Sequence, residues 1–208
     1  MCYSERSSWW AFGVGSAGIL ANIGFLAFFR RYSLIPFMAA WISVVVMQLI
    51  EALMYRETDC DSDKSQRLRS AAVTALRIQP IALTMGAAIN CLVEGTYPAL
   101  WAVTVVMAVA AISFGPSGDG LELSPVQAPS TDACIWRPND GDHPLGYFVG
   151  MTAPVLLLPK AWGALYAILL VVTVTAGTVA DAETWGSKWC HLANYAPIIM
   201  LPASASNW

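Results

Sequence analysis

Long apolar runs, each bounded by a few polar or charged residues, form the main pattern along the chain. A helix crosses the roughly 30 Å of membrane hydrocarbon with about 20 apolar residues. The runs of about that length predict membrane-spanning helices over residues 9–29, 34–55, 71–93, 97–114 and 162–180.

Two further apolar runs are shorter, and each contains a proline. Residues 147–159 include Pro154, so they form either a fifth span with polar ends or a re-entrant segment. Residues 189–203 include Pro197 and predict a shorter last span. We therefore predict an all-α protein with one domain over residues 1–208. It is a polytopic transmembrane helical bundle of about seven spans, with six as the alternative.

A polar segment rich in Gly, Pro, Asp and Ser covers residues 115–146. Loops of more than about 15 residues are uncommon as simple connections. We expect this segment to be an extramembrane loop that is either folded on the surface or bound to a partner.

The composition supports a membrane location. Of the 208 residues, 57% are hydrophobic and 12% are charged, whereas a soluble domain carries about 25% charged residues. So few charges do not cover a water-soluble surface of this size, and the lipid bilayer is the expected surrounding. The formal net charge of −3 offers no basic face for phosphates. This argues against nucleic acid as a partner.

The basic residues are divided unequally between the two sides of the seven-span arrangement. The N-terminal side carries Arg6, Arg56, Lys64, Arg67, Arg69, Arg77, Arg137 and Lys188, and the opposite side carries Arg30, Arg31 and Lys160. The positive-inside rule places the more basic side in the cytoplasm or an equivalent compartment. We expect a cytoplasmic, stromal or matrix N-terminus, with the thylakoid as one candidate membrane.

The five cysteines leave at least one thiol unpaired in a monomer. Cys91 and Cys190 lie in predicted spans, where we expect them to act as small apolar residues. Cys2, Cys60 and Cys134 share the N-terminal side, for which the charge distribution predicts a reducing compartment. We therefore expect reduced thiols.

Two features of the spans predict packing and anchoring. The GVGSAG stretch matches GxGxxG but lies inside a span, without the strand that precedes a dinucleotide site. A stripe of small residues in this span predicts close helix packing instead: Ala11, Gly15, Gly18 and Asn22. Tryptophans at span ends predict anchors at the membrane interface: Trp9, Trp10, Trp162, Trp185 and Trp189.

Polar residues inside the predicted spans are the candidates for function. Glu51 lies near the end of an otherwise apolar run, and a carboxylate is costly both in a protein core and in lipid. Helical spacing places Gln48 with Glu51 on one face of the second span, and Asn90 with Glu94 on one face of the third. Such residues usually face the bundle interior. The candidate cofactor-binding residues are Glu51, His191, Gln48, Glu94, Asn90 and Asn194.

Three interpretations of Glu51 remain open. In the first, a neutral Glu51 belongs to a structural network with Gln48 and with amides or His191 on neighbouring helices. In the second, Glu51, Glu94 or His191 coordinates a metal or the central ion of chlorophyll or another tetrapyrrole. In the third, Glu51 belongs to a proton or ion relay. The sequence lacks the Glu-x-x-His pairs on which di-metal bundles depend.

Three stretches carry a resemblance to a known family: the N-terminal MCYS, QLIEAL at residues 48–53, and GSKWCHLAN at residues 186–194. The chain resembles an uncharacterised, mostly bacterial family of multi-pass membrane proteins. Members typically open MCFSA, with Gln-x-x-Glu in the second span and Gly-x-x-Trp-Cys before the last. The matching positions are Cys2, Ser4, Gln48, Glu51, Gly186, Trp189 and Cys190. Ala52 replaces the usual glycine, and residues 56–185 carry no match. The resemblance implies a multi-pass fold and marks Gln48 and Glu51, but it implies no activity.

No nucleophile is recognisable beside a base, and the chain has only two histidines, so the sequence does not predict an enzyme. We hypothesise a non-catalytic accessory subunit of a large membrane complex. The expected setting is an energy-transducing complex, photosynthetic or respiratory, in which the chain packs against other subunits and binds pigment or lipid. The alternative is a small channel, transporter or proton-coupled carrier that uses Glu51, Glu94 and His191.

Overall fold

Helices make up most of the described chain. The computed structural model describes residues 4–95, 123–127, 134–138, 145–180, 189 and 191–205. The elements are α1 (Glu5–Phe28), the 3-10 helix η1 (Tyr32–Leu34), α2 (Ile35–Ala40), α3 (Ile42–Met54), α4 (Asp63–Val93), β1 (Leu123–Gln127), β2 (Cys134–Pro138), α6 (Leu145–Leu157), α7 (Lys160–Ala180) and α9 (Ala196–Ala205). The predicted helical class is confirmed for these residues, with one two-stranded sheet added to it.

Three segments in the described part of the chain are long and apolar enough to cross a membrane. They are α1, the continuous stretch Tyr32–Met54 that contains η1, α2 and α3, and α4. Lys160–Ala176 of α7 is a shorter apolar helix. These helices indicate an integral membrane protein, as predicted. The predicted span at residues 97–114 lies outside the described residues.

Helix α4 begins at Asp63 rather than near residue 71, where the apolar run begins. The hydroxyl of Ser62 caps this earlier start by accepting a hydrogen bond from the Ser65 amide at 3.2 Å. The first turns are therefore a charged extension of the apolar helix, because a cap and a polar helical sequence suffice outside the membrane.

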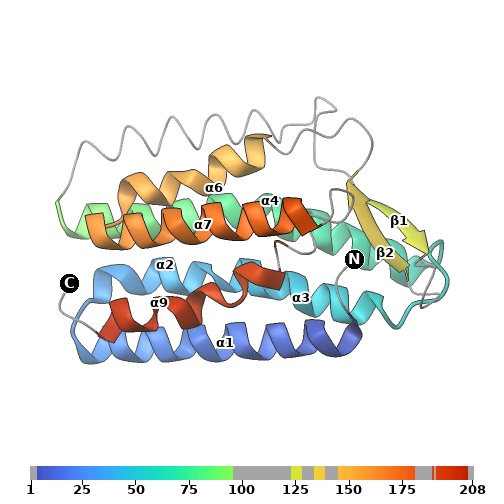
Figure 1. Cartoon of the computed structure of the whole chain (residues 1–208), viewed down its shortest axis with the longest axis horizontal. Coiled ribbons are helices and arrows are strands. Elements are labelled where there is room, and N and C mark those ends of the chain that lie inside the picture. The colour runs from blue at the N-terminus through green and yellow to red at the C-terminus, as the bar shows by residue number, and fades with distance from the viewer. Residues whose placement is uncertain are drawn as a thin grey trace.

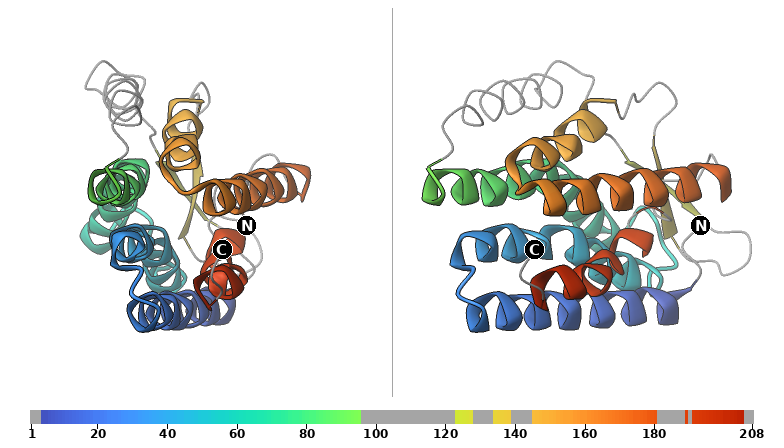
Figure 2. Two further views of the ribbon diagram at one scale, coloured as in Figure 1. Left: turned by 90° about the vertical axis from the view of Figure 1, so that its left-hand side faces the viewer. Right: turned by 60° about the vertical axis from the view of Figure 1, so that its left-hand side comes forward.

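The helices form a closed ring when the molecule is viewed from one end (Figure 2). Helix α1 contacts α3 and α9, α3 contacts α4, α4 contacts α6, and α6 contacts α7, which reaches α9. All of them run roughly along the long axis (Figure 1). The strands lie at one end, here called the hairpin end, where α1 begins and α3 ends (Figure 1). The opposite end holds the end of α4 and the start of α7.

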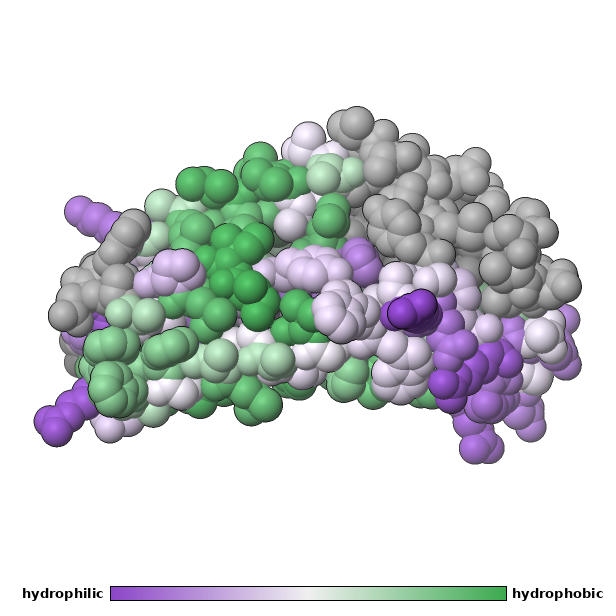
Figure 3. Space-filling view, turned by 60° about the horizontal axis from the view of Figure 1, so that its bottom comes forward, coloured by the Kyte–Doolittle hydropathy of each residue, from purple (hydrophilic) through white to green (hydrophobic). Residues whose placement is uncertain are grey.

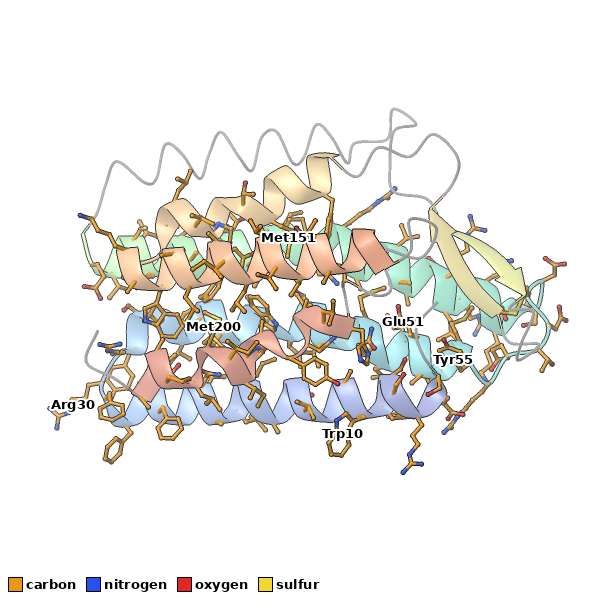
Figure 4. The ribbon with its side chains drawn as sticks, in the orientation of Figure 1. Trp10, Arg30, Glu51, Tyr55, Met151 and Met200 are labelled. Atoms are coloured by element: carbon orange, nitrogen blue, oxygen red, sulfur yellow. A yellow bond between two sulfur atoms is a disulfide. The ribbon has the colours of Figure 1, made fainter. Side chains whose placement is uncertain are left out.

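Aromatic side chains fill the centre of the ring. Phe37, Trp41 and Tyr166 contact one another edge to face, with ring centroids 5.7 to 6.0 Å apart. Met151 of α6 and Met200 of α9 are also fully buried and point into this interior (Figure 4). Edge-to-face aromatic pairs add to the stability gained by burial. Residues of α2, α3, α6, α7 and α9 thus share one core.

The predicted small-residue stripe of α1 packs against the last segment of the chain. A Cβ atom placed on Gly18 would lie 3.0 Å from the Pro197 Cβ. The Asn22 Nδ2 donates to the carbonyl oxygens of Gly18, at 2.8 Å, and of Pro197, at 2.6 Å. Ser204 donates its hydroxyl to the Asn22 Oδ1. The prediction of close packing on this face is confirmed.

Helices α6 and α9 are short. Helix α6 has 13 residues and continues through Pro154, and α9 has 10 residues with Pro197 in its first turn. At about 1.5 Å per residue they extend roughly 20 Å and 15 Å, less than the membrane core. For residues 147–159, the fifth span and the re-entrant segment both stay predictions.

A disulfide joins the hairpin to the turn between α3 and α4. Strands β1 and β2 pair antiparallel, with Gln127 opposite Cys134, and Cys134 is bonded to Cys60 with a Cα–Cα distance of 5.4 Å. The Cys134 amide also donates to the Glu57 carbonyl at 3.0 Å. The expectation of reduced thiols is therefore wrong for this pair. Cys91 is a buried thiol, as expected, while Cys2 and Cys190 lie outside the described residues.

The surface separates into an apolar middle and polar ends (Figure 3). Large apolar side chains are exposed along the helices, for example Leu20 and Phe28 of α1 and Val171 of α7. Trp10 is exposed and projects from α1, as an interfacial anchor would (Figure 4). Trp162 and Trp189 are buried, so their prediction as anchors is wrong. Their indole rings belong to the core instead. Trp185 lies outside the described residues.

Candidate functional site

Glu51 belongs to a hydrogen-bonded chain inside the bundle, nearer to the hairpin end (Figure 4). Its side chain is 3% exposed, and its Oε2 accepts a hydrogen bond of 2.6 Å from the Nε2 of the fully buried Gln48. The Gln48 Oε1 lies 3.4 Å from the Nδ1 of His191. The chain Glu51–Gln48–His191 thus connects α3 to the segment before α9.

Local helical geometry sets up this chain. Gln48 and Glu51 are three residues apart on α3, a spacing at which side chains meet on one face of a helix. His191 lies in a helical stretch whose described residues are 189 and 191–193, and its ring contacts Tyr195 edge to face at 5.6 Å. The backbone of α3 therefore positions the carboxyl and the amide, and the segment before α9 positions the imidazole.

Gly15 of α1 allows the last segment to approach closely. A Cβ atom at this position would lie 2.8 Å from the Val45 Cγ2 and 2.9 Å from the Asn194 Oδ1. A larger residue would push α3 or the last segment away, together with His191. Asn194 is fully buried at this contact, so the structure places this predicted site residue beside the Glu51 chain, against α1.

A second polar contact lies next to the first. Tyr147 of α6 donates its hydroxyl to the Gln79 Oε1, and the Gln79 Nε2 donates to the Ser43 carbonyl at 3.1 Å. The Tyr147 ring packs edge to face on Trp189, with centroids 5.4 Å apart. These contacts join α3, α4, α6 and the last segment at one level of the bundle.

Asn90 has a different setting, toward the opposite end of α4. Its Nδ2 lies 3.4 Å from the Leu157 carbonyl, and the Cys91 Sγ lies 2.9 Å from the same oxygen. Leu157 is the last residue of α6, where carbonyl groups have no partner within the helix. Asn90 and Cys91 thus hold the end of α6 against α4.

Glu94 lies at the opposite end of the molecule from the hairpin, just after α4, and it is exposed. Its Oε1 accepts a hydrogen bond of 2.8 Å from the Ser33 hydroxyl. The structure therefore brings Gln48, Glu51 and His191 together but places Glu94 apart from them. The aromatic core around Trp41 and Tyr166 fills the intervening part of the ring.

The surroundings of Glu51 bear on the metal and the tetrapyrrole that the sequence suggested. Among the described residues, no three His, Cys, Asp or Glu side chains gather as metal ligands would. The cavity lined by Trp41, Tyr166, Trp189 and Ala193 has a volume of about 10 Å³, room for at most about one water molecule. A tetrapyrrole does not fit in that cavity. The Glu51 chain has the features of a structural hydrogen-bond network that connects α3 to the segment before α9.

Tyr147 and Tyr166 are the site residues that sequence reasoning missed. Both are buried, and the Tyr166 hydroxyl donates to the Met151 carbonyl at 2.7 Å. A tyrosine within an apolar span could have indicated them, because a buried hydroxyl requires a hydrogen-bond partner. Their partners could not have been inferred from the sequence, since they lie on other helices.

Comparisons with protein-family models, with curated proteins and with solved structures found no match for this chain. The resemblance carried by the two ends and by the Gln48–Glu51 pair therefore stays a hypothesis. Cys2, Gly186 and Cys190 of that resemblance lie outside the described residues.

Proposed function

We propose that this protein is a non-catalytic accessory subunit of a larger membrane complex. The observation that carries the proposal is the hydrogen bonding of the polar side chains inside the bundle. Gln48, Glu51 and Gln79 bond to groups on the same or neighbouring helices, which is expected of groups that hold a bundle together. An energy-transducing complex, photosynthetic or respiratory, is the proposed setting.

The outer surface supports a role in assembly. Ile168, Val171 and Val172 project from one helix, α7, and are all more than half exposed. In a membrane such residues contact either lipid or the helices of another subunit. The hairpin, which the disulfide fixes to the bundle, offers a rigid extramembrane element for a partner.

The experiment that tests this proposal uses the tagged chain in its native membrane. Purification in a mild detergent should yield other membrane subunits in a fixed ratio to the chain. A control purification after harsh detergent should yield the chain alone. Recovery of the chain alone under both conditions would contradict the proposal.

A proton-coupled carrier is the second candidate, because the Glu51 chain contains two titratable groups inside the bundle. A carrier predicts pH-dependent flux in proteoliposomes of the purified chain, abolished by Glu51→Gln and unchanged by Glu94→Gln. The accessory-subunit proposal predicts no flux in either variant or in the wild type.

For orientation, we propose that the hairpin end faces an oxidising compartment, opposite to the side predicted from the basic residues. Disulfides persist in oxidising compartments and are rare in the cytosol. Cys60 and Cys134 are bonded at this end. The basic residues here are partly paired with acids, as in the Arg56–Glu5 contact of 2.6 Å.

A further inference from the structure

A pocket of about 630 Å³ opens at the end of the bundle opposite the hairpin. It lies between the turn after α1, the end of α4 and the turn that joins α6 to α7. Its polar lining comes from all three places: Arg30, Arg31, Asn90, Glu94, Lys160 and Trp162. Arg30, at the outer edge, is labelled in Figure 4. The pocket is separate from the Glu51 chain.

The charge of this pocket is opposite to that of the whole protein. Three cationic side chains and one carboxylate line it, so 3 − 1 gives a charge of +2, compared with −3 for the chain. The carboxylate of Glu94 already accepts a hydrogen bond from Ser33. Helix α7 begins at Lys160, so the positive end of its dipole adds to the field. The pocket therefore favours an anion.

Two buried polar atoms in the lining lack partners within the described part of the chain. Asn90 is 3% exposed and its Oδ1 accepts no hydrogen bond, and Trp162 is 1% exposed and its Nε1 donates none. Buried polar atoms are nearly always hydrogen-bonded in folded proteins. A ligand that supplies hydroxyl groups would satisfy both, since a hydroxyl donates and accepts.

The rim of the pocket is apolar and exposed. Val93 lies at the end of α4 and Leu156 near the end of α6, and both line the pocket while being about 65% and 64% exposed. Leu92 is exposed beside them. Because this rim ends the membrane-spanning helices, it lies where lipid headgroups meet acyl chains.

We propose that this pocket binds the headgroup of an anionic phospholipid that carries hydroxyl groups, with phosphatidylglycerol as the matching chemistry. The cationic groups hold the phosphate, Asn90 and Trp162 bond the headgroup hydroxyls, and the acyl chains lie on the rim. Inorganic phosphate shares the charge but has no acyl chains. The proposal does not depend on the accessory-subunit function.

The test is native mass spectrometry of the full-length protein in detergent, titrated with phosphatidylglycerol. One molecule should bind at saturation, and more tightly than phosphatidylcholine. Each cationic residue near an anionic lipid contributes a factor of about five in affinity. Lys160→Gln should therefore weaken binding by about fivefold. Arg67→Gln, which also removes one positive charge but at the hairpin end, should leave the affinity unchanged.

The remaining outcomes each decide the proposal. Equal affinity for the two lipids, or equal loss from Lys160→Gln and Arg67→Gln, would overturn it. Competition by millimolar inorganic phosphate without any preference for lipid would show a soluble anion as the ligand and overturn the lipid assignment. Asn90→Leu should weaken phosphatidylglycerol binding more than it weakens binding of phosphatidic acid, which lacks the hydroxyls. An equal loss for these two lipids would contradict the role of Asn90.

Discussion

Replacing Glu51 by leucine tests the structural interpretation of this carboxyl most sharply. Leucine has a similar size, so the change removes the hydrogen bond from Gln48 without opening a large cavity. The Gln48 amide is fully buried, and leaving such a donor without its acceptor costs about 1–3 kcal/mol. Because donor and acceptor lie on the same helix, the cost comes mainly from the stranded Gln48 donor, and we expect a loss of about 1–2 kcal/mol.

The double variant Gln48→Leu/Glu51→Leu separates this bond from the other effects of the single changes. Removing both partners leaves no orphaned group between them, so its cost should be less than the sum of the single costs. The difference, the coupling energy, should be about 1 kcal/mol. Glu51→Gln should cost less than Glu51→Leu, since its amide oxygen still accepts from Gln48.

The assay is reversible unfolding in mixed micelles with increasing SDS, followed by circular dichroism. Gln66→Leu is the matched control, because Gln66 is an exposed glutamine at the hairpin end and should change the free energy of unfolding by less than about 0.5 kcal/mol. Strictly additive costs for Gln48→Leu and Glu51→Leu would refute the reasoning, as would a Glu51→Leu variant as stable as the wild type.

Three further predictions concern packing and orientation. A Cβ on Gly86 would lie 2.7 Å from the Pro36 carbonyl oxygen, so Gly86→Ala should lower the free energy of unfolding by about 1–3 kcal/mol. Gly24→Ala, with nothing within 4 Å, should be neutral or stabilising. Asn22→Leu should cost about 1–3 kcal/mol in the same assay, because the Pro197 carbonyl loses its donor and Ser204 loses one of its two acceptors. A membrane-impermeant maleimide applied to intact cells should label Arg67→Cys at the hairpin end but not Lys160→Cys.

Each of these has a contradicting result. Equal stability of Gly86→Ala and Gly24→Ala would mean that α2 and α4 do not approach closely at that point. An Asn22→Leu variant as stable as the wild type would contradict the contact between α1 and α9. Labelling of Lys160→Cys alone would restore the orientation predicted from the basic residues, and would place the disulfide in a reducing compartment.

The helical class and the long spans could be predicted from the sequence, because apolar length alone decides whether a helix can cross a membrane. The same holds for the pairing of Gln48 with Glu51, since their spacing fixes them on one helical face. Close packing at the stripe around Gly15 and Gly18 could also be predicted, because small residues at helical spacing allow another backbone to approach.

The contacts between distant segments could not be predicted. Nothing in the local sequence indicates that Cys134 meets Cys60, since the two are 74 residues apart and a two-stranded sheet brings them together. The burial of Trp162 has the same origin, because it depends on the packing of α7 against other helices, α6 among them. Residue type alone groups Glu94 with Glu51, although Glu51 lies toward the hairpin end and Glu94 at the opposite end of the molecule.

The most direct test of the accessory-subunit proposal is the size of the native particle. The chain, gently solubilised from its own membrane, would be followed through size-exclusion chromatography by immunodetection and by absorption across the visible range. The proposal predicts elution in a particle much larger than one 22.4 kDa chain in its detergent micelle, together with the absorbance of the pigments of the complex. Elution as a small, colourless particle would contradict the proposal and favour the carrier.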